Sequence, residues 1–259
     1  MRDFLKEVEA GSATKSPEAS AQANMRPKLI KRFYKLVTVE PFEDGFTALL
    51  DGKSIKTPGR NAIVFPTKDA AQLFAIEWDA QKTEINPITM PITRLAYTAI
   101  DGIALDPQDV LEDVVKFSNS DLLYYRADNP QDLVDLQSKH WDPILDWVAT
   151  YTGAKFKIGE GMIHIPQPKE SVKLFTAKIS VHSTPMKLAC LHTFTSLSGS
   201  ALIALALAEA FLDVDAAWAA AHVDENFNIS RWGEDEDAQK RQTYRFGEMK
   251  AAHALFVTL

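Results

Sequence analysis

Three things are scarce in this sequence, and each scarcity argues against a class of protein. Cys190 is the only cysteine among 259 residues, so an internal disulfide is excluded and a reducing compartment is indicated. Lysine and arginine number 28 against 35 aspartates and glutamates, and this net charge of −7 argues against a nucleic-acid partner. The most apolar segment, residues 201–212, is shorter than the roughly 20 residues that span a bilayer. We expect no membrane insertion and a core helix at 201–212.

The first 28 residues show none of the usual targeting patterns. They lack the apolar run of a secretory signal peptide. A mitochondrial transit peptide would be rich in arginine and poor in acids, whereas this segment contains several acids. Its Ala/Ser-rich composition predicts a disordered lead-in over residues 1–28. The acids that argue against a transit peptide are Asp3, Glu7, Glu9 and Glu18.

The segment from residue 32 to residue 65 has the pattern of short β-strands. Runs of valine, threonine, phenylalanine and leucine alternate there with two Asp-Gly pairs, Asp44-Gly45 and Asp51-Gly52. Both residues of such a pair tolerate a positive φ, which is what a two-residue hairpin turn requires. The pairs therefore predict two hairpins.

One helix is expected to follow this β-rich portion. After a further short strand at 62–66, Thr67 is the predicted N-cap of a helix whose apolar side carries Ala71, Phe74, Ala75 and Trp78. The strip that follows, from Ile85 to Pro91, contains two prolines. Proline biases the residue before it away from the helical region, so this strip is predicted to be extended.

The rest of the chain has mainly helical signals. Asp106 before Pro107 predicts an N-cap with proline at the first helical position, and Asn129 before Pro130 predicts the same arrangement for the next helix. Within that helix, Pro143 is expected to start a new helix or to cause a kink.

The later helices are delimited by glycine and proline. Gly153 is a natural stop for the helix before it. Thr184-Pro185 opens a long apolar segment that runs through 212, and residues 214–259 are predicted to form two helices joined near 231–237. The predicted fold class is therefore α+β by segregation, with a small β-rich domain before a larger helical one. The predicted boundaries are a lead-in at 1–28, a β-rich domain with one helix at 29–100 and an all-helical domain at 101–259.

No motif in the sequence carries catalytic chemistry. The six histidines are scattered without the i, i+4 spacing of a helical zinc site, and one cysteine cannot build a thiolate cluster. Cys190 is surrounded by apolar neighbours, which is typical of a buried, inert thiol. We therefore expect no enzyme activity, no metal and no cofactor. The alternative is a hydrolase or transferase that uses scattered carboxylates with Cys190 or a histidine.

Three tryptophans are each followed directly by a polar or turn residue near the end of an element. For the first two, the structural interpretation is that the ring covers an edge of the core while its N–H finds a carbonyl. The third lies in a stretch crowded with charged and amide side chains, which is either a solvated face or a recognition surface. The pairs are Trp78-Asp79, Trp141-Asp142 and Trp232-Gly233.

Six short stretches, in this order, make the chain resemble a known family. It is similar to the assembly chaperones for the alpha subunit of the ATP synthase catalytic head, found in mitochondria and related bacteria. The resemblance runs from about Lys31 to Leu259. The stretches are "LDGKSIKTP" (50–58), "AIEWDAQ" (75–81), "MPITRLAYTAID" (90–101), "DLLYYRAD" (121–128), "HWDPILDW" (140–147) and "ENFNISRWGED" (225–235).

The resemblance implies a function as well as a fold. It implies a chaperone that binds the newly made alpha subunit without ATP and covers the surface later occupied by the beta subunit, an apolar patch until then. A general holdase without a preferred client is the competing interpretation. A bacterial member would be a soluble cytoplasmic protein, monomeric when free, whereas eukaryotic relatives would act in the mitochondrial matrix.

The resemblance also gives two sets of residues. Glu225 is the first choice for client contact, because it lies in the last matched stretch, and its neighbours complete a client-binding set of Glu225, Asp224, Arg231, Trp232 and Glu234. The second set is expected to be structural and to join the β-rich portion to the helical one, with Trp78 as a packing hinge. Its members are Trp78, Asp79, Met90, Pro91, Trp141 and Asp142.

Overall fold

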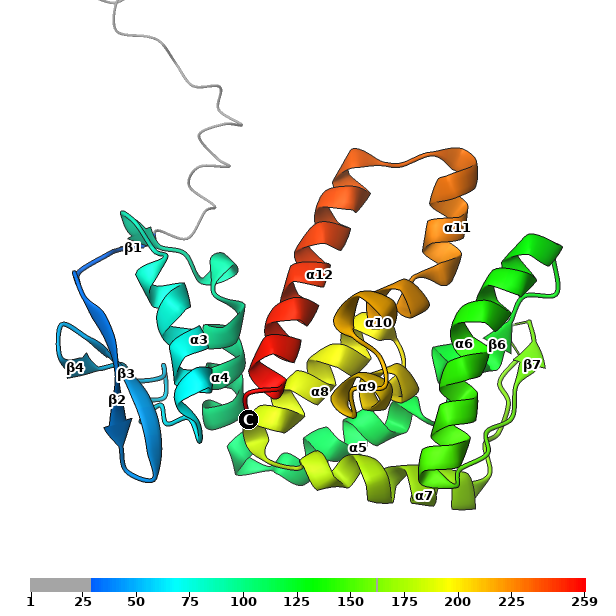
Figure 1. The fold of residues 1–259 in the computed structure, drawn as a ribbon, viewed down its shortest axis with the longest axis horizontal. Helices are drawn as coiled ribbons and strands as arrows, with labels where there is room; N and C mark the ends of the chain where they lie inside the picture. The colour runs from blue at the N-terminus through cyan, green and yellow to red at the C-terminus, as the bar shows by residue number, and fades with distance from the viewer. Residues whose placement is uncertain (1–28, 162) are drawn as a thin grey trace, which may run out of the picture. The chain divides into compact units, whose positions relative to one another are not determined.

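The computed structural model describes residues 29–161 and 163–259 (Figure 1). The predicted lead-in at 1–28 lies outside the described residues. Backbone contacts group the described chain into two units, a small one with residues 29–33 and 81–86, and a large one with 34–80 and 87–259. The domain boundary predicted near residue 100 stays a prediction.

The small unit is a two-stranded antiparallel ribbon. Strand β1 (Ile30–Lys31) pairs with β5 (Glu84–Ile85), so that Ile30 lies opposite Ile85. The backbone N–H of Arg32 extends the pairing by donating to the carbonyl of Thr83 at 3.0 Å.

The large unit begins with a three-stranded antiparallel sheet in the order β2-β3-β4. The strands are β2 (Val37–Phe42), β3 (Gly45–Leu50) and β4 (Lys53–Ser54). The second predicted turn is confirmed: Leu50 pairs with Lys53, and both residues between them have a positive φ, 48° for Asp51 and 78° for Gly52.

The first turn lies one residue earlier than predicted. Phe42 pairs with Gly45, so the turn is made by Glu43 and Asp44, and Gly45 belongs to the strand. Glycine is required there for a different reason than turn geometry. A Cβ on Gly45 would lie 2.2 Å from the carbonyl oxygen of Phe65, which accepts a hydrogen bond from the N–H of Phe46, the next residue.

Helix α3 (Lys68–Asp79) begins as predicted. The Oγ1 of Thr67 accepts a hydrogen bond from the N–H of Ala70 at 3.1 Å, and the predicted apolar side is buried and packs on β2 and β3. The strand predicted at 62–66 is absent among the described residues, where only two isolated bridges form, Phe46 with Phe65 and Lys56 with Ala62.

The strip from Ile85 to Pro91 is extended only at its start, so that prediction was wrong for most of its length. After β5, Pro87–Thr89 form a 3-10 turn (η1), and Pro91 is the first residue of helix α4 (Pro91–Asp101). Proline suits this position because the first N–H of a helix has no partner within the helix anyway.

The predicted start of helix α5 (Pro107–Phe117) is confirmed, since the carboxylate of Asp106 accepts from the N–H of Asp109 at 3.2 Å. For helix α6 (Gln131–Thr152) the predicted start was wrong, because Pro130 occupies the N-cap position and Asn129 lies outside. Pro143 starts no new helix, and α6 runs through it. Gly153 ends α6 as expected, with φ 78°.

Buried side chains on either side of Pro143 explain why α6 continues. Trp141 and Ile144 are both 1% exposed, and their packing offsets the roughly 3 kcal/mol that proline costs inside a helix.

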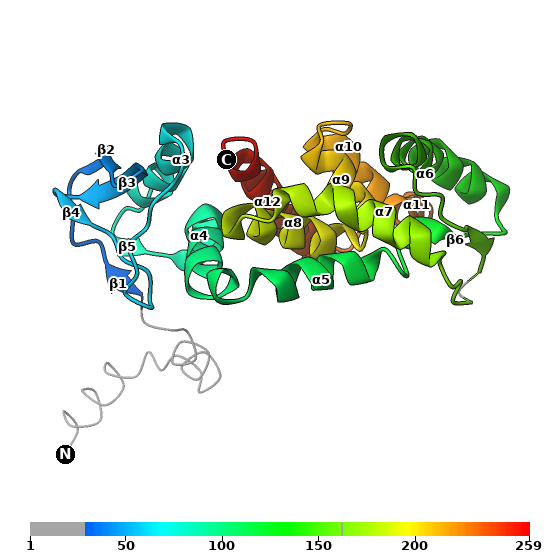
Figure 2. The same cartoon turned by 90° about the horizontal axis from the view of Figure 1, so that it is seen from below.

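The centre of the large unit is helix α9 (Ala201–Ala208), in which the first seven residues are buried. This confirms the core helix predicted at 201–212, although α9 ends at Ala208. Helix α8 (Pro185–Ser198) precedes it, ends at Gly199 with φ 69°, and runs beside α4, α5 and α12 (Figure 2). No helix in the described ranges is both long and apolar enough to cross a membrane.

The C-terminal segment contains three helices where two were predicted: α10 (Val214–Ala221), α11 (Val223–Trp232) and α12 (Glu236–Phe256). The break between α10 and α11 lies at His222, with φ −120°, and neither glycine nor proline marks it in the sequence. The α+β class itself is confirmed. The remaining elements are η2 (Ile103–Leu105), η3 (Leu122–Tyr124), β6 (Tyr125–Arg126), β7 (Gly159–Glu160), α7 (Lys169–Ile179) and η4 (Ser180–His182).

Candidate functional site

Helices α11 and α12 form a hairpin joined at residues 233–235 (Figure 1). A groove lies between them. Its volume is about 420 Å³. We call it the hairpin groove. It is lined by Glu225, Asn228, Ile229, Trp232, Gly233, Glu234, Asp235, Ala238, Gln239 and Gln242.

Trp232 is the most unusual side chain of the hairpin groove. It is 78% exposed, although tryptophan is usually largely buried and is enriched where proteins bind other molecules. The turn that follows is fixed at both ends: Gly233 has φ 88°, and the carboxylate of Asp235 accepts from the N–H of Ala238 at 2.7 Å. Trp232 is therefore exposed at the end of a defined helix.

The hairpin groove is acidic. Three carboxylates line it, those of Glu225, Glu234 and Asp235, and no lysine or arginine is among its lining residues. The Glu225 side chain is 47% exposed, and the Nε2 of His222 lies 3.9 Å from its carboxylate. Burial lowers the pKa of His222, so this imidazole is neutral at pH 7 and leaves the Glu225 carboxylate uncompensated.

The structure divides the five predicted client residues between two sides of α11. Glu225, Trp232 and Glu234 line the hairpin groove. Asp224 and Arg231 instead face α6: Asp224 accepts from the Nε2 of Gln137 at 2.7 Å, and Arg231 forms an ion pair with Asp132. The contacts with Gln137 and Asp132 attach α11 to α6. Within α11, Arg231 also lies over the ring of Phe227, 5.1 Å from its centroid.

Among the predicted structural residues, Trp141 and Asp142 are attached to neighbouring elements. The Nε1 of Trp141 donates to the carbonyl of Ala220 at 2.7 Å, which matches the expectation that its N–H finds a carbonyl. Asp142 pairs with Arg126 at 2.8 Å.

Trp78 lies between two other rings, Tyr34 at 5.8 Å and Phe74 at 6.1 Å, and its carbonyl accepts from the Tyr34 hydroxyl at 2.6 Å. It is buried, as is Met90, whereas Asp79 is exposed. The prediction that the Trp78 N–H finds a carbonyl was wrong, because its Nε1 has no hydrogen-bond partner among the residues that the structure describes. Pro91 is half-buried at the start of α4. These positions agree with a packing role for Trp78 and Met90.

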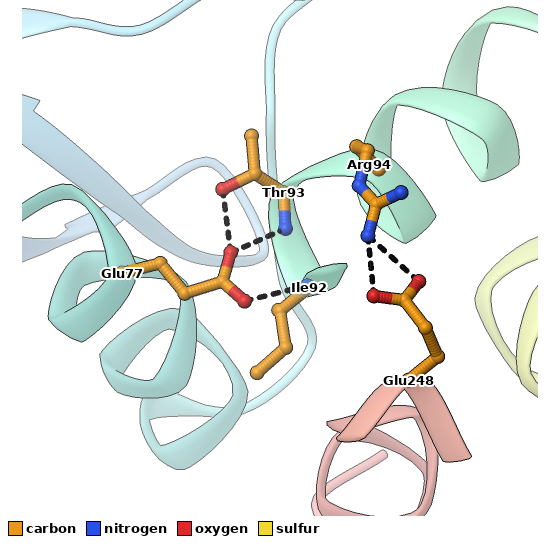
Figure 3. Close-up of polar contacts among 5 residues, drawn as sticks. All are labelled: Glu77, Ile92, Thr93, Arg94 and Glu248. Carbon is orange, nitrogen blue, oxygen red and sulfur yellow. Dashed lines mark hydrogen bonds and ion pairs between the residues drawn. The ribbon is translucent and has the colours of Figure 1, made fainter. Parts of the chain in front are cut away.

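The connection between α3 and α4 depends on a residue that was not predicted, Glu77 (Figure 3). Its two carboxylate oxygens accept from the N–H groups of Ile92 and Thr93, both at 2.7 Å, and from the Thr93 hydroxyl at 2.8 Å. Burial raises the pKa of Glu77, and these three hydrogen bonds work in the opposite direction. Glu77 thus acts as an N-cap supplied by another helix, which α4 needs because Met90 offers no capping side chain.

An ion pair connects α4 to α12. The Nη2 of Arg94 donates to both carboxylate oxygens of Glu248, at 2.6 and 2.7 Å (Figure 3). Helix α12 is also one wall of the hairpin groove. The contacts of Glu77 and Arg94 therefore connect α3, through α4, to the helix that forms this wall.

We expect Glu77→Ala to lower the free energy of unfolding by about 1–2 kcal/mol, the usual cost of removing an N-cap. The N–H groups of Ile92 and Thr93 would lose their acceptor. Urea unfolding followed by circular dichroism measures this change, with Glu84→Ala at an exposed position of β5 as the control. A Glu77→Ala protein as stable as wild type would show that α4 needs no cap from α3.

Thirty-four percent of residues are identical between this chain and Atp12 from Paracoccus denitrificans, whose crystal structure superimposes with a TM-score of 0.83. The match covers 88% of this chain and 98% of the Paracoccus chain. This chain belongs to the ATP12 family of chaperones.

Other members of the ATP12 family agree with this assignment. The ATP12 chaperone protein family model matches residues 31–149. The crystal structure of Atu1473 from Agrobacterium tumefaciens, described as a candidate chaperone, is 47% identical with a TM-score of 0.87 and covers 100% of this chain and 97% of its own. The mitochondrial atp12 protein of Schizosaccharomyces pombe is 23% identical over 81% of this chain and 76% of its own length. The resemblance to ATP synthase assembly chaperones is confirmed.

Cys190 is fully buried, and burial raises the pKa of its thiol to about 12, so no thiolate is available at neutral pH. Within residues 29–161 and 163–259, no three histidine, cysteine, aspartate or glutamate side chains are grouped so that they could hold a metal ion.

Proposed function

We propose that this protein is an ATP-independent chaperone for the newly made alpha subunit of the ATP synthase catalytic head. It binds that subunit through the hairpin groove and covers the surface that the beta subunit later occupies. In a bacterium it acts as a free monomer in the cytoplasm, without enzyme activity. The family assignment supports the assembly role, and the exposure of Trp232 in an acidic groove without lysine or arginine supports the choice of surface.

The physical argument for the hairpin groove concerns hot spots. A specific interface buries roughly 1,600 Å² in total, but a few aromatic or arginine side chains supply most of the binding free energy. Trp232 is such an aromatic anchor, and the acids around it favour a partner with a basic side chain. The surface is mixed polar and apolar, which suits reversible binding of one client better than capture of many unfolded chains.

We expect Glu225→Lys to weaken binding to the purified alpha subunit by at least about tenfold, because it reverses the charge in the groove. Glu225 lies in the first turn of α11, where lysine also costs some helix stability. Glu170→Lys in the first turn of α7 carries the same cost outside the groove and is the matched control. Isothermal titration without nucleotide measures both affinities.

Trp232→Ala is expected to have a similar effect without loss of stability, since the ring is largely exposed. Leu105→Ala is its control, because Leu105 is also an exposed apolar side chain but lies far from Trp232 in the sequence, at the end of η2. If the groove variants and the controls bind the alpha subunit equally well, the hairpin groove is not the client surface. Equal binding of wild type to several unrelated unfolded proteins would favour the general holdase instead.

A further inference from the structure

A second groove runs along α6, on the side of α11 away from the hairpin groove. It consists of three neighbouring hollows of about 470, 290 and 480 Å³. The first two share Arg126, Ala127 and Gln137, and the last two share Asp142 and Ile158. We call it the α6 groove.

The floor of the α6 groove is a regular helical surface. In the last two hollows, lining residues recur on one face of α6, from Val134 through Ser138, Asp142 and Leu145 to Ala149, a distance of about 22 Å at 1.5 Å per residue. Spaces between successive turns of a helix accept the side-chain ridges of another helix. The floor therefore offers a surface of the right length and period for a helix of about four turns.

The opposite wall adds apolar surface. It is formed by β6 and by residues 155–161, and its Ile158 is 53% exposed. On the floor, Val134 and Leu145 are half-buried. Apolar side chains thus stand on both sides of the groove, and an occupant would cover them.

The charge of the α6 groove is negative. Arg126 is neutralised within the groove, because it pairs with Asp142 and its Nε donates to the carbonyl of Leu123 at 3.0 Å. The other charged lining residues are one base, Lys155, and three acids, Asp146, Glu160 and Asp224. The excess of acids favours a cationic occupant.

We propose that the α6 groove binds an amphipathic helix of a partner protein, with its apolar face toward Ile158 and Leu145 and with lysine or arginine along its borders. Asp224 lines the α6 groove, and the next residue, Glu225, lines the hairpin groove, so one partner can hold α11 from both sides. The identity of this partner rests on the proposed function: it is the alpha subunit, which then contacts two surfaces at once.

The first test uses a fluorescent probe in the full-length protein. Ser138→Cys places a thiol in the α6 groove, and Gln108→Cys places one on α5 as the control. Cys190 does not compete for an environment-sensitive dye because it is buried. Two synthetic helical peptides of about 16 residues, identical except that one carries lysine and the other glutamate at its polar positions, serve as ligands.

The lysine peptide is expected to bind at least about tenfold more tightly than the glutamate peptide, with a fluorescence change at the groove probe and none at the control probe. Ile158→Asp and, separately, Asp146→Lys are expected to weaken its binding about tenfold. Both positions are exposed, so the variants should fold. Equal binding of the two peptides, a response at both probes, or unchanged binding by both variants would overturn the proposal.

The second test separates this inference from the proposed function. Purified alpha subunit is expected to displace the lysine peptide from the Ser138→Cys probe. If the lysine peptide binds but the alpha subunit does not bind the protein at all, the proposed function fails and the α6 groove stands as a site for another protein. If the alpha subunit binds without displacing the peptide, the claim that it occupies this groove is wrong, while the proposed function remains.

Discussion

We expect Trp78→Arg to lower the free energy of unfolding by at least about 4 kcal/mol. This is a large part of the 5–15 kcal/mol by which an ordinary folded domain is stable. The Trp78 side chain is only 8% exposed and lies between the rings of Tyr34 and Phe74. Removing a buried large aromatic costs about 3–5 kcal/mol by itself. Arginine would add an unpaired buried charge, which costs several kcal/mol more unless its side chain reaches solvent.

The destabilisation by Trp78→Arg would extend to other contacts of α3. Phe74 also contacts Phe65 at 5.4 Å, so the ring cluster connects α3 to the sheet. Glu77, one residue before Trp78, caps α4. A charge in the cluster would therefore weaken both attachments of α3, and urea unfolding of the purified variant measures the loss.

Trp78→Phe is the matched control. The Nε1 of Trp78 is buried and has no hydrogen-bond partner within the part of the chain that the structure describes. Replacing Trp78 with phenylalanine therefore removes no hydrogen bond of this N–H. We expect a loss of about 1–2 kcal/mol from the smaller ring. If Trp78→Arg kept the melting temperature of wild type and abolished client binding, Trp78 would be a contact residue and its packing role would be wrong.

The second large effect is expected at Asp121, which is fully buried. Its carboxylate accepts from the N–H of Leu123 at 3.2 Å and from the N–H of Leu202 at 3.1 Å, and so connects η3 to the first turn of the central helix α9. Asp121→Ala would leave these buried donors unpaired, at about 1–3 kcal/mol each. A total loss of about 3–5 kcal/mol is expected from the unpaired donors and the cavity together, and urea unfolding at pH 7 measures it.

The same residue gives a pH dependence with a definite sign. Burial raises the pKa of Asp121 to about 6 from its ordinary value of 3.8, so between these values the folded protein binds a proton that the unfolded chain does not. Its contribution to the free energy of unfolding is therefore fully present below pH 3.8 and falls as the pH rises toward and past 6, by up to about 3 kcal/mol.

Asp121→Asn isolates this contribution because asparagine does not titrate. The difference in free energy of unfolding between wild type and Asp121→Asn should change between pH 4 and pH 7, in the direction that disfavours wild type at higher pH. Comparing the two proteins cancels other groups, such as Asp101, where hydrogen bonds from Thr57 and Asn61 lower the pKa and give the opposite slope. A difference that is constant with pH would contradict the assignment.

Local signals allowed much of the fold to be predicted. Thr67 and Asp106 cap their helices as expected, and Gly153 ends its helix, because each acts through its own backbone neighbours. The cap provided by Glu77 and the bond from the N–H of Leu202 to Asp121 were not predictable in the same way. Their acceptors and donors are brought together only by tertiary packing, and no sequence spacing indicates them. Met90 gave one usable hint, since a helix that begins at proline without a capping side chain needs a cap from elsewhere.

The candidate site was predictable in part. Glu225, Ile229 and Trp232 follow the i, i+4, i+7 pattern of one helical face, and they line the hairpin groove together. Asp224 and Arg231 follow an i, i+7 pattern on a neighbouring face, about 100° away, and attach α11 to α6. The pattern could separate the two sets of residues, but which face is exposed depends on where α6 and α12 lie, and this is a property of the tertiary structure.

The most direct test of a dedicated assembly chaperone is gentle co-purification of the tagged protein from its native cell, with partners identified by mass. The account predicts recovery of the ATP synthase alpha subunit without added nucleotide, retained by Glu170→Lys and lost with Glu225→Lys while the circular dichroism spectrum of each variant stays that of wild type. A broad spread of unfolded proteins, or an alpha subunit recovered equally with Glu225→Lys, would contradict it.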